Sequence, residues 1–303
     1  MEFKHISVLF EETLDSLNIK PDGLYVDCTC GGAGHSKAIL ERLENGKLVA
    51  IDRDPDAIEV IKERIGSDDR VEIVNDNFSN IKSILNGRKA DGILADLGVS
   101  SFQLDNAQRG FSFHKDAPLD MRMSKTGKSA FDVVNGYSEQ ELANIINRYG
   151  EEKFARNIAK NIVKSRNVKP IETTLQLAEI VKNSVPAKAR REGHPARKTF
   201  QAIRIEVNGE LEKLSRALDD AFDCLNPGGI IAVITFHSLE DRIVKEKFAE
   251  WTRGCTCPEE FPVCVCGNKP KGELPFKSKS PSDAELEENP RARSSRLRAF
   301  KKY

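Results

Sequence analysis

The first hundred residues alternate short apolar runs with amphipathic stretches. The apolar runs are rich in β-branched residues and predict strands at 24–29, 47–52, 71–76 and 90–97. Around them, apolar residues recur at spacings of three and four, which predicts helices at 7–18, 36–44, 55–65 and 79–86. This alternation is typical of βαβ units and a parallel sheet, whose ligand site lies at the carboxyl ends of the strands.

The rhythm changes near residue 106. Three amphipathic stretches with polar or proline-containing joins predict helices at 138–150, 153–166 and 174–185. The α/β pattern then returns with one long helix along an apolar stripe from Phe200 to Leu225, a strand at 230–236 and a helix at 238–251. We therefore expect a discontinuous α/β domain, 1–105 and 200–303, interrupted by an inserted all-helical domain, 106–199.

Composition and charge narrow the function. Hydrophobic residues make up 39% of the 303-residue chain and charged residues 31%, the balance of a globular protein. No run approaches the ~20 apolar residues of a membrane span, and the first residues lack a signal peptide's apolar run. We expect a cytoplasmic protein with no membrane partner. The zero net charge hides a basic segment: 106–199 holds 18 Lys and Arg against 10 Asp and Glu, which suits a polyanion.

A glycine-rich turn, Asp27 to Ser36, follows the first predicted strand and opens a helix. Glycines let the backbone turn tightly and let a ligand approach N–H groups at a helix N-terminus. The dinucleotide fingerprint G-x-G-x-x-G is not met, which disfavours a nicotinamide dehydrogenase. Asp52 ends the second strand, where its carboxylate can accept hydrogen bonds from ribose hydroxyls; the alternatives are a helix cap or a surface acid. Phe78, after the third strand, flanks an adenine or packs in the core.

These residues resemble the small-subunit rRNA cytosine-N4 methyltransferases, also called the MraW or RsmH family. The matching stretches cover nearly the whole chain in order: His5–Leu9, Asp27–Ser36, Ala50–Asp54, Asp96–Ser101, Gln103–Asp105, Arg109–Phe113, Pro118–Met123, Thr199–Arg204, Ser238–Arg242 and Asn289–Ser294. The resemblance implies a Rossmann-like class I methyltransferase core with the inserted helical domain. It also implies methyl transfer from S-adenosylmethionine to the N4 amine of a cytidine in 16S rRNA at the decoding centre.

The resemblance also implies the site residues. It assigns cofactor contacts to Ala33, Gly34, His35, Asp52, Phe78, Asp96 and Gln103. The family turn usually has glycine where Ala33 stands, and alanine fits there if its φ is negative. The implied partner is 16S rRNA or the small ribosomal subunit, and a homodimer stays open. The alternatives are a methyltransferase for DNA or a small molecule, which the basic insertion disfavours, and a non-catalytic RNA-binding protein.

The chemistry points to the end of the fourth strand. A cytosine amine is a poor nucleophile, so the enzyme must orient it toward the methyl group. Asp96 is the candidate here: we assign its carboxylate to the cofactor first, with a direct catalytic role as the alternative. The Asp/Asn-Pro-Pro-aromatic signature of many amino-methyltransferases is absent, so the base holder is not identified. Ser100, Ser101 and His237 are secondary candidates, each also consistent with a structural role.

Several residues are candidates for RNA contact, and each has a structural alternative. Aromatic and methionine side chains that can stack on a displaced base are Phe111, Phe113, Met121 and Met123. Arg109 and Arg122 are candidate phosphate contacts. Basic clusters that form an RNA surface or merely a solvated face are Lys153, Arg156, Lys160 and Lys164; Lys188, Arg190, Arg191, Arg197 and Lys198; and Arg291, Arg293, Arg296 and Arg298.

Seven cysteines complete the inventory. We expect Cys28 and Cys30 to pack under the glycine turn rather than face a base. The remaining cluster is Cys255, Cys257, Cys264 and Cys266, in the pattern C-x-C-x6-C-x-C. It offers soft ligands for zinc or a set of thiols, and C-x-C pairs are less usual in zinc sites than C-x2-C. We assign no metal to the catalytic mechanism.

Overall fold

The computed structural model describes residues 7–188, 190, 193–258, 260–263 and 265–303. The chain forms two compact units. The α/β unit is Met1–Gly98 with Lys213–Tyr303, and the helical unit is Val99–Glu212. The predicted insertion, 106–199, is shorter than the helical unit at both ends. No helix of the described residues is long and apolar enough to span a membrane.

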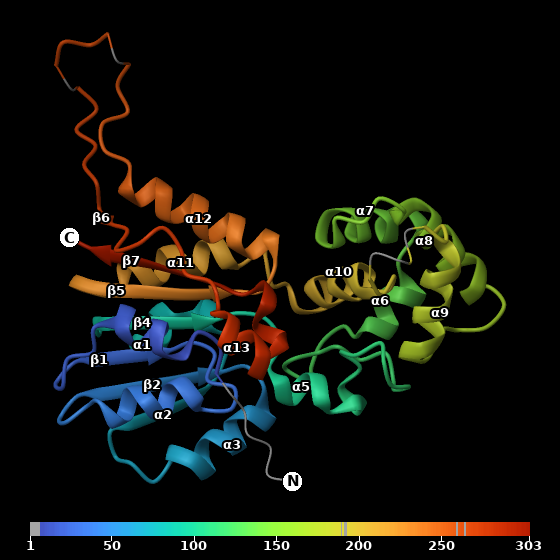
Figure 1. Ribbon diagram of the computed structural model, residues 1–303, viewed down its shortest axis with the longest axis horizontal. Coiled ribbons are helices and arrows are strands. Elements are labelled where there is room, and N and C mark those ends of the chain that lie inside the picture. The colour runs from blue at the N-terminus through green and yellow to red at the C-terminus, as the bar shows by residue number, and fades with distance from the viewer. Residues whose placement is uncertain (1–6, 189, 191–192, 259, 264) are drawn as a thin grey trace. The chain divides into compact units, whose positions relative to one another are not determined.

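The α/β unit is built on one mixed sheet, which in the described residues has seven strands in the order β3-β2-β1-β4-β5-β7-β6 (Figure 1). The strands are β1 Leu24–Asp27, β2 Lys47–Asp52, β3 Val71–Asn75, β4 Ala90–Asp96, β5 Leu225–Thr235, β6 Gly272–Glu273 and β7 Arg296–Lys302. The first five pair in parallel, and β7 pairs antiparallel with β5 and β6. The parallel strands confirm the predicted α/β class, a Rossmann-like arrangement, and the order reverses between β1 and β4.

Both faces of this sheet are apolar and covered. Neighbouring strand residues alternate between two buried clusters: Tyr25 belongs to one and Val26 to the other. That alternation follows from the two-residue period of a strand. Helices α1 Phe10–Leu17, α2 Gly34–Glu41 and α3 Pro55–Ile65 contribute to the first cluster, and α4 Ile81–Leu85, α11 Leu214–Asp223 and α12 Ser238–Thr252 contribute to the second. A short helix, α13 Asp283–Glu288, precedes β7.

The helical unit contains the three helices predicted from periodicity. They are α7 Glu139–Gly150, α8 Ala155–Arg166 and α9 Thr174–Ser184, accompanied by α5 Ser101–Asp105, α6 Ala130–Gly136 and α10 Arg197–Asn208. Four of these helices begin with a capping box, in which the cap hydroxyl and the third helical residue bond each other's backbone. The cap residues are Ser100, Ser129, Ser138 and Thr173.

The single long helix predicted from Phe200 to Leu225 is wrong. The chain forms α10 and α11, separated at Gly209, which has a left-handed φ of 58° and donates its N–H to the carbonyls of Ile205 and Glu206. Arg204 fixes the turn, because its Nε and Nη2 lie 3.0 and 2.9 Å from the Glu210 carboxylate. Apolar spacing continues across the break, so periodicity alone could not reveal it. The division between the units falls just after this turn.

Candidate active site

Acidic side chains end three neighbouring strands of the α/β unit. Asp27 ends β1, Asp52 ends β2 and Asp96 ends β4. The strand order reverses between β1 and β4, and in open α/β sheets ligands bind at the carboxyl ends beside such a reversal. The glycine-rich turn follows β1 at the same edge. The sheet therefore gathers residues that lie far apart in the sequence.

Asp52 anchors the glycine-rich turn. One carboxylate oxygen, Oδ2, accepts a hydrogen bond from the Gly31 N–H at 2.8 Å, and Oδ1 accepts one from the Asp54 N–H at 2.9 Å. Asp54, not Asp52, caps α3, because its side chain accepts from the Asp56 N–H. Burial raises the pKa of Asp52 to about 6. Each carboxylate oxygen keeps a lone pair that a hydroxyl donor can use.

Ala33 adopts a conformation that alanine disfavours. Its φ is 61° and its ψ is 18°, in the left-handed region, so the expected negative φ is not met. The Ala33 N–H donates to the Cys30 carbonyl at 2.7 Å, which closes the turn before α2. A left-handed alanine costs about 1–2 kcal/mol. At the next position glycine is required for space, because a Cβ on Gly34 would lie 2.1 Å from the Ser7 Oγ.

His35 and Asp96 lie next to each other on this edge. The buried His35 ring stacks on Phe10 with centroids 5.7 Å apart, and its Nδ1 lies 3.8 Å from Asp96 Oδ2. The Asp96 N–H donates to Thr29 Oγ1 at 2.6 Å. Its other carboxylate oxygen, Oδ1, is buried and has no hydrogen-bond partner among the described residues. Such an oxygen is suited to an ammonium or amine donor on a ligand.

The charge environment of Asp96 includes a residue that sequence reasoning passed over. Burial, followed by the negative charges of Asp27 and Glu240, raises the pKa of Asp96 well above its ordinary value. Glu240 is buried and accepts a hydrogen bond from the Phe236 N–H at 3.0 Å. His237 caps α12 and its Nε2 lies 3.2 Å from Glu240, so the structure gives His237 a structural role. The signal for Glu240 was its place three residues after a helix cap that follows a buried strand.

Phe78 and Gln103 were the remaining cofactor candidates. Phe78 begins a short 3₁₀ helix, η1 Phe78–Asn80, and packs half-buried against the second apolar cluster. Gln103 belongs to the helical unit, where its Oε1 accepts from the Ser100 N–H at 3.1 Å in the capping box of α5. Ser100 is the cap and Ser101 the first residue of that helix. The cofactor roles of Phe78 and Gln103 stay predictions.

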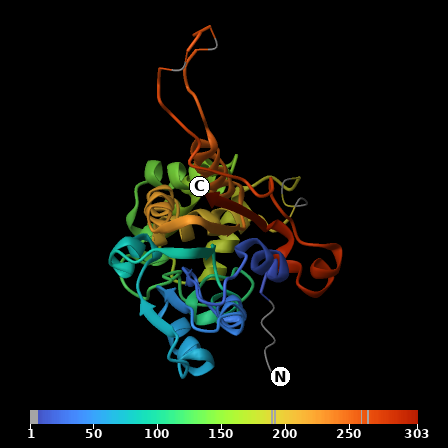
Figure 2. The same cartoon turned by 90° about the vertical axis from the view of Figure 1, so that its left-hand side faces the viewer.

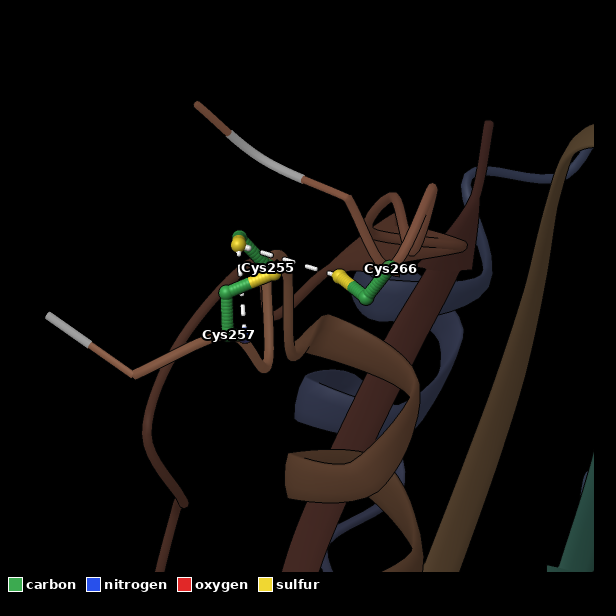
Figure 3. Close-up of side chains that lie close together, drawn as sticks. All are labelled: Cys255, Cys257 and Cys266. Atoms are coloured by element: carbon green, nitrogen blue, oxygen red, sulfur yellow. Dashed lines mark hydrogen bonds between the residues drawn. The ribbon is translucent and has the colours of Figure 1, made fainter. Parts of the chain in front are cut away.

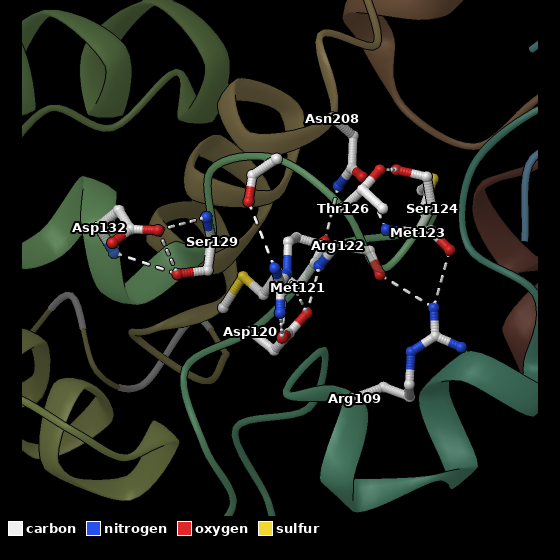
Figure 4. Close-up of polar contacts among 11 residues, drawn as sticks. Arg109, Asp120, Met121, Arg122, Met123, Ser124, Thr126, Ser129, Asp132 and Asn208 are labelled. Atoms are coloured by element: carbon white, nitrogen blue, oxygen red, sulfur yellow. Dashed lines mark hydrogen bonds and ion pairs between the residues drawn. The ribbon is translucent and has the colours of Figure 1, made fainter.

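In the helical unit, Arg109 and Arg122 are engaged internally (Figure 4). The buried Arg109 donates from Nη2 to the carbonyls of Arg122 and Met123, both at 2.9 Å. Arg122 holds Asp120 through Nε and Nη2, at 2.6 Å for the shortest contact. The two phosphate contacts expected from residue type are therefore wrong for Arg109, which is buried, and doubtful in chemistry for Arg122, whose charge is already paired. Both arginines instead shape the loop between them.

Asn208 completes this loop and was missed by sequence reasoning. Its Nδ2 donates to the Met121 carbonyl at 2.7 Å, and its Oδ1 accepts from the Met123 N–H at 2.9 Å (Figure 4). Phe111, Met121 and Met123 are buried, which favours the packing alternative over base stacking. Phe113 is half-buried, with its ring stacked on His194 at a centroid distance of 4.3 Å.

The basic residues of α8 are exposed as predicted. Lys153, just before the helix, and Arg156, Lys160 and Lys164 face solvent, while Ile158 and Ile162 are buried on the opposite side. Within the described ranges these four cations form no ion pair.

The other two basic clusters fare unevenly. Lys188, Arg190 and Arg197 are exposed, and Arg191 lies outside the described residues. Lys198 is half-buried, and its Nζ donates to the Glu151 carbonyl at 3.0 Å. At the C-terminus, Arg291, Arg293 and Arg296 are exposed, but Arg298 on β7 pairs with Asp241 at 2.7 Å and is therefore a sheet-edge contact.

Comparison with known proteins decides the family. The model of the MraW methylase family matches residues 2–303. The chain belongs to the MraW methylase family. It is 57% identical over 308 residues to the ribosomal RNA small subunit methyltransferase H of Clostridium botulinum strain Kyoto, with both chains covered completely. It is 55% identical over 311 residues to ribosomal RNA small subunit methyltransferase H 2 of Agathobacter rectalis, covering 100% of this chain and 99% of that one.

One solved structure, described as a putative rRNA methylase from Clostridium thermocellum, aligns with a TM-score of 0.48 at 13% identity, over 98% of this chain and 99% of that one. That likeness is too distant to add to the family assignment. The family makes the chain an S-adenosylmethionine-dependent methyltransferase. The edge described above fits this cofactor, because it offers a carboxylate at the glycine turn and a buried, unsatisfied carboxylate oxygen at β4.

The cysteines beside the turn are not reactive groups of this methylase. Cys28 and Cys30 are both buried, as expected, and Cys30 Sγ lies 3.3 Å from the Asp27 carbonyl. Burial, aided by the negative charge of Asp27, raises the pKa of both thiols well above the ordinary value. A buried thiol with a raised pKa is a poor nucleophile.

Proposed function

We propose that this methylase transfers a methyl group from S-adenosylmethionine to the exocyclic N4 amine of a cytidine in 16S rRNA, in the cytoplasm. The full-length identity of 57% to a protein named for the small-subunit ribosomal RNA supports the RNA class. The observation that carries the chemistry is the buried Asp96 Oδ1, which has no partner among the described residues and is suited to an amine.

We assign the cofactor to the edge formed by the strand ends. Asp52 accepts hydrogen bonds from the ribose hydroxyls, because its carboxylate is already oriented by two backbone N–H groups. Ala33, Gly34 and His35 line the turn, and Phe78 flanks the adenine. Gln103 is assigned to the same cofactor by family resemblance alone.

We assign the methionyl amino group of the cofactor to Asp96. The cofactor supplies an electrophilic methyl group on a sulfonium. As the N4–carbon bond forms, the sulfur–carbon bond breaks and N4 loses a proton, so the amine must be held in line and its proton accepted. A carboxyl group with a raised pKa, such as Asp96, is a competent acceptor near neutral pH. Glu240, which faces Asp96 electrostatically, is the second group that influences this proton.

The cysteines argue against methylation at ring carbon 5. That reaction needs an accessible thiolate to add covalently to the pyrimidine. Cys28 and Cys30 are buried and their pKa values are raised. Amine methylation needs no such nucleophile, which favours N4.

The helical unit is our candidate for RNA binding. Exposed cations that form no ion pair within the described ranges follow α8, and neutralising phosphates with such cations releases counterions. A small-molecule methyltransferase has no use for this surface. An RNA-binding protein without activity has no use for an unsatisfied carboxylate at the cofactor edge.

The test is tritiated methyl transfer to 16S rRNA and to small ribosomal subunits, with the product nucleoside identified by mass spectrometry. We expect N4-methylcytidine, and we expect the double variant Cys28→Ala, Cys30→Ala to keep most of the turnover. The surface variant Asp69→Asn serves as a control for handling. 5-Methylcytidine as the product, or loss of turnover in a folded cysteine variant, contradicts the N4 proposal. Transfer to DNA alone contradicts the RNA proposal.

A further inference from the structure

The segment between α12 and β6, residues 253–271, differs from the rest of the α/β unit. Its described residues form no helix or strand, and it extends away from the sheet (Figures 1 and 2). Its apolar side chains are exposed: Phe261 by 50%, Val263 by 70% and Val265 by 72%. A segment that buries no core of its own needs a cross-link or a bound metal to hold one conformation.

Three cysteines of this segment converge. The Sγ atoms of Cys255, Cys257 and Cys266 all lie within 4.8 Å of one another, and Figure 3 shows their side chains gathered at one point. Cys255 Sγ and Cys266 Sγ are 3.7 Å apart, far beyond the ~2.05 Å of a disulfide bond. Thiolates around tetrahedral zinc, with Zn–S bonds of ~2.3 Å, are separated by about 3.8 Å. The observed separation is therefore that of two ligands on one zinc ion.

Backbone N–H groups point at these sulfur atoms. The N–H of Cys257 donates to Cys255 Sγ at 3.4 Å, and the N–H of Val265 donates to Cys257 Sγ at 3.3 Å. Cys266 Sγ accepts from two N–H groups, those of Thr256 at 3.3 Å and Asn268 at 3.4 Å. Hydrogen bonds to a charged form favour it, so this set stabilises thiolates, the form that binds metal.

The two arms of the segment are joined at their base. Asn268 donates from Nδ2 to the Gly254 carbonyl at 2.7 Å, and the Lys271 N–H donates to the Trp251 carbonyl at 2.8 Å. These contacts hold Cys255 and Cys257 on one arm opposite Cys266 on the other. Cationic residues of the same segment, Arg253, Lys269 and Lys271, offset the negative charge that several thiolates bring.

We propose that Cys255, Cys257 and Cys266 bind one structural zinc ion. Cys264 completes the C-x-C-x6-C-x-C pattern and is our candidate for the fourth ligand; it lies outside the described residues. All four ligands are then thiolates and no coordination position is open, which makes the ion structural rather than catalytic. The zinc fixes the conformation of 253–271 and takes no part in methyl transfer.

The first experiment measures the metal in the full-length protein. We expect one zinc per chain by elemental mass spectrometry of protein purified under reducing conditions. After zinc is replaced by cobalt(II), we expect the visible absorption of tetrahedral thiolate coordination. The double variant Cys255→Ser, Cys266→Ser should lose at least about 100-fold in zinc affinity, as expected when half of the ligands go, whereas Thr256→Ala in the same segment should bind like the parent. Both positions are exposed, so the variants should fold.

The second experiment measures order in the segment. Proteolysis within 253–271 should become at least about tenfold faster after zinc removal with a chelator, and added zinc should restore resistance in the parent but not in the cysteine variant. Absence of zinc, unchanged zinc content in the cysteine variant, iron with sulfide in its place, or a Cys255–Cys266 disulfide in freshly reduced protein would each overturn the proposal. Neither readout depends on methyl transfer, so the result is independent of the proposed rRNA activity.

Discussion

The cofactor edge of the α/β unit and the basic face of α8 use charge in opposite ways. Asp27, Asp52 and Asp96 come from three separate strands and are largely withdrawn from water, and burial raises their pKa values. The cations of α8 come from one helix, stay in water and form no ion pair within the described ranges. Buried groups orient a small ligand through short, directed contacts, whereas exposed cations attract a polyanion with little geometric demand. The predictions below probe this difference.

The largest effect should come from the buried side. Asp96→Asn keeps the size of the side chain but removes its negative charge and its ability to accept a proton. We expect turnover to fall by on the order of 10²-fold, as for loss of one preorganised polar group in an active site. Steady-state kinetics separate the roles: a raised KM for S-adenosylmethionine with unchanged kcat assigns Asp96 to the cofactor only, and a lowered kcat assigns it to the amine. Unchanged kinetics would remove Asp96 from the site.

Asp52→Ala should have the next largest effect, on cofactor affinity. It removes an acceptor for the ribose hydroxyls and releases the Gly31 N–H that the carboxylate holds. We expect binding to weaken by ~1–3 kcal/mol, the range for hydrogen bonds to a charged group. Calorimetric titration measures it, with Asp69→Asn as a matched surface control. A dissociation constant equal to that of the parent would contradict the ribose assignment.

Charge reversal on α8 should leave the cofactor site unchanged and act on RNA binding alone. We expect Lys160→Glu with Lys164→Glu to lower affinity for 16S rRNA and to make the logarithm of affinity less dependent on the logarithm of salt, by roughly two phosphate contacts. Lys62→Glu with Lys245→Glu, a matched pair on the α/β unit, should keep the parent slope. Equal slopes for both pairs would make α8 an ordinary solvated face.

The pH dependence of stability tests the burial of Asp52. Its pKa is about 6 in the folded protein against 3.8 as the ordinary value, so the folded state holds the proton more tightly. Its contribution to stability is therefore full below pH ~3.8 and is lost as pH rises through about 6. In cofactor-free protein, Asp52→Asn should gain stability relative to the parent by about 1 kcal/mol more at pH 7 than at pH 5. Denaturant unfolding at the two pH values measures this; a constant difference would mean that Asp52 is solvated.

The smallest effect concerns Ala33. Ala33→Gly should relieve the left-handed strain of about 1–2 kcal/mol, but the buried methyl group is lost and the unfolded chain gains freedom. We expect a net change in the free energy of unfolding of no more than about 1 kcal/mol, with cofactor affinity kept. Thermal unfolding measures it. A large loss of stability would show that the methyl packing outweighs the strain.

Regular patterns made much of the fold predictable. The strands that start the chain and the helices α7, α8 and α9 were found because strand and helix periods are local properties. The failures arose where one residue or one distant partner decides. Gly209 breaks the long predicted helix through its own φ, and β7 was not predicted because its existence depends on pairing with β5.

The sequence by itself determined the α/β class, the Asp27 to Ser36 turn, the carboxylates at the strand ends and the amphipathic face of α8, since each follows from local spacing and residue type. Only the tertiary structure decided which charges are used internally. Arg109 and Arg298 looked like RNA contacts, yet one holds a loop and the other pairs with Asp241. It also brought Glu240 near Asp96 and gathered Cys255, Cys257 and Cys266. The reason is physical: a side chain's type fixes what it can bind, but folding fixes which partner lies within reach.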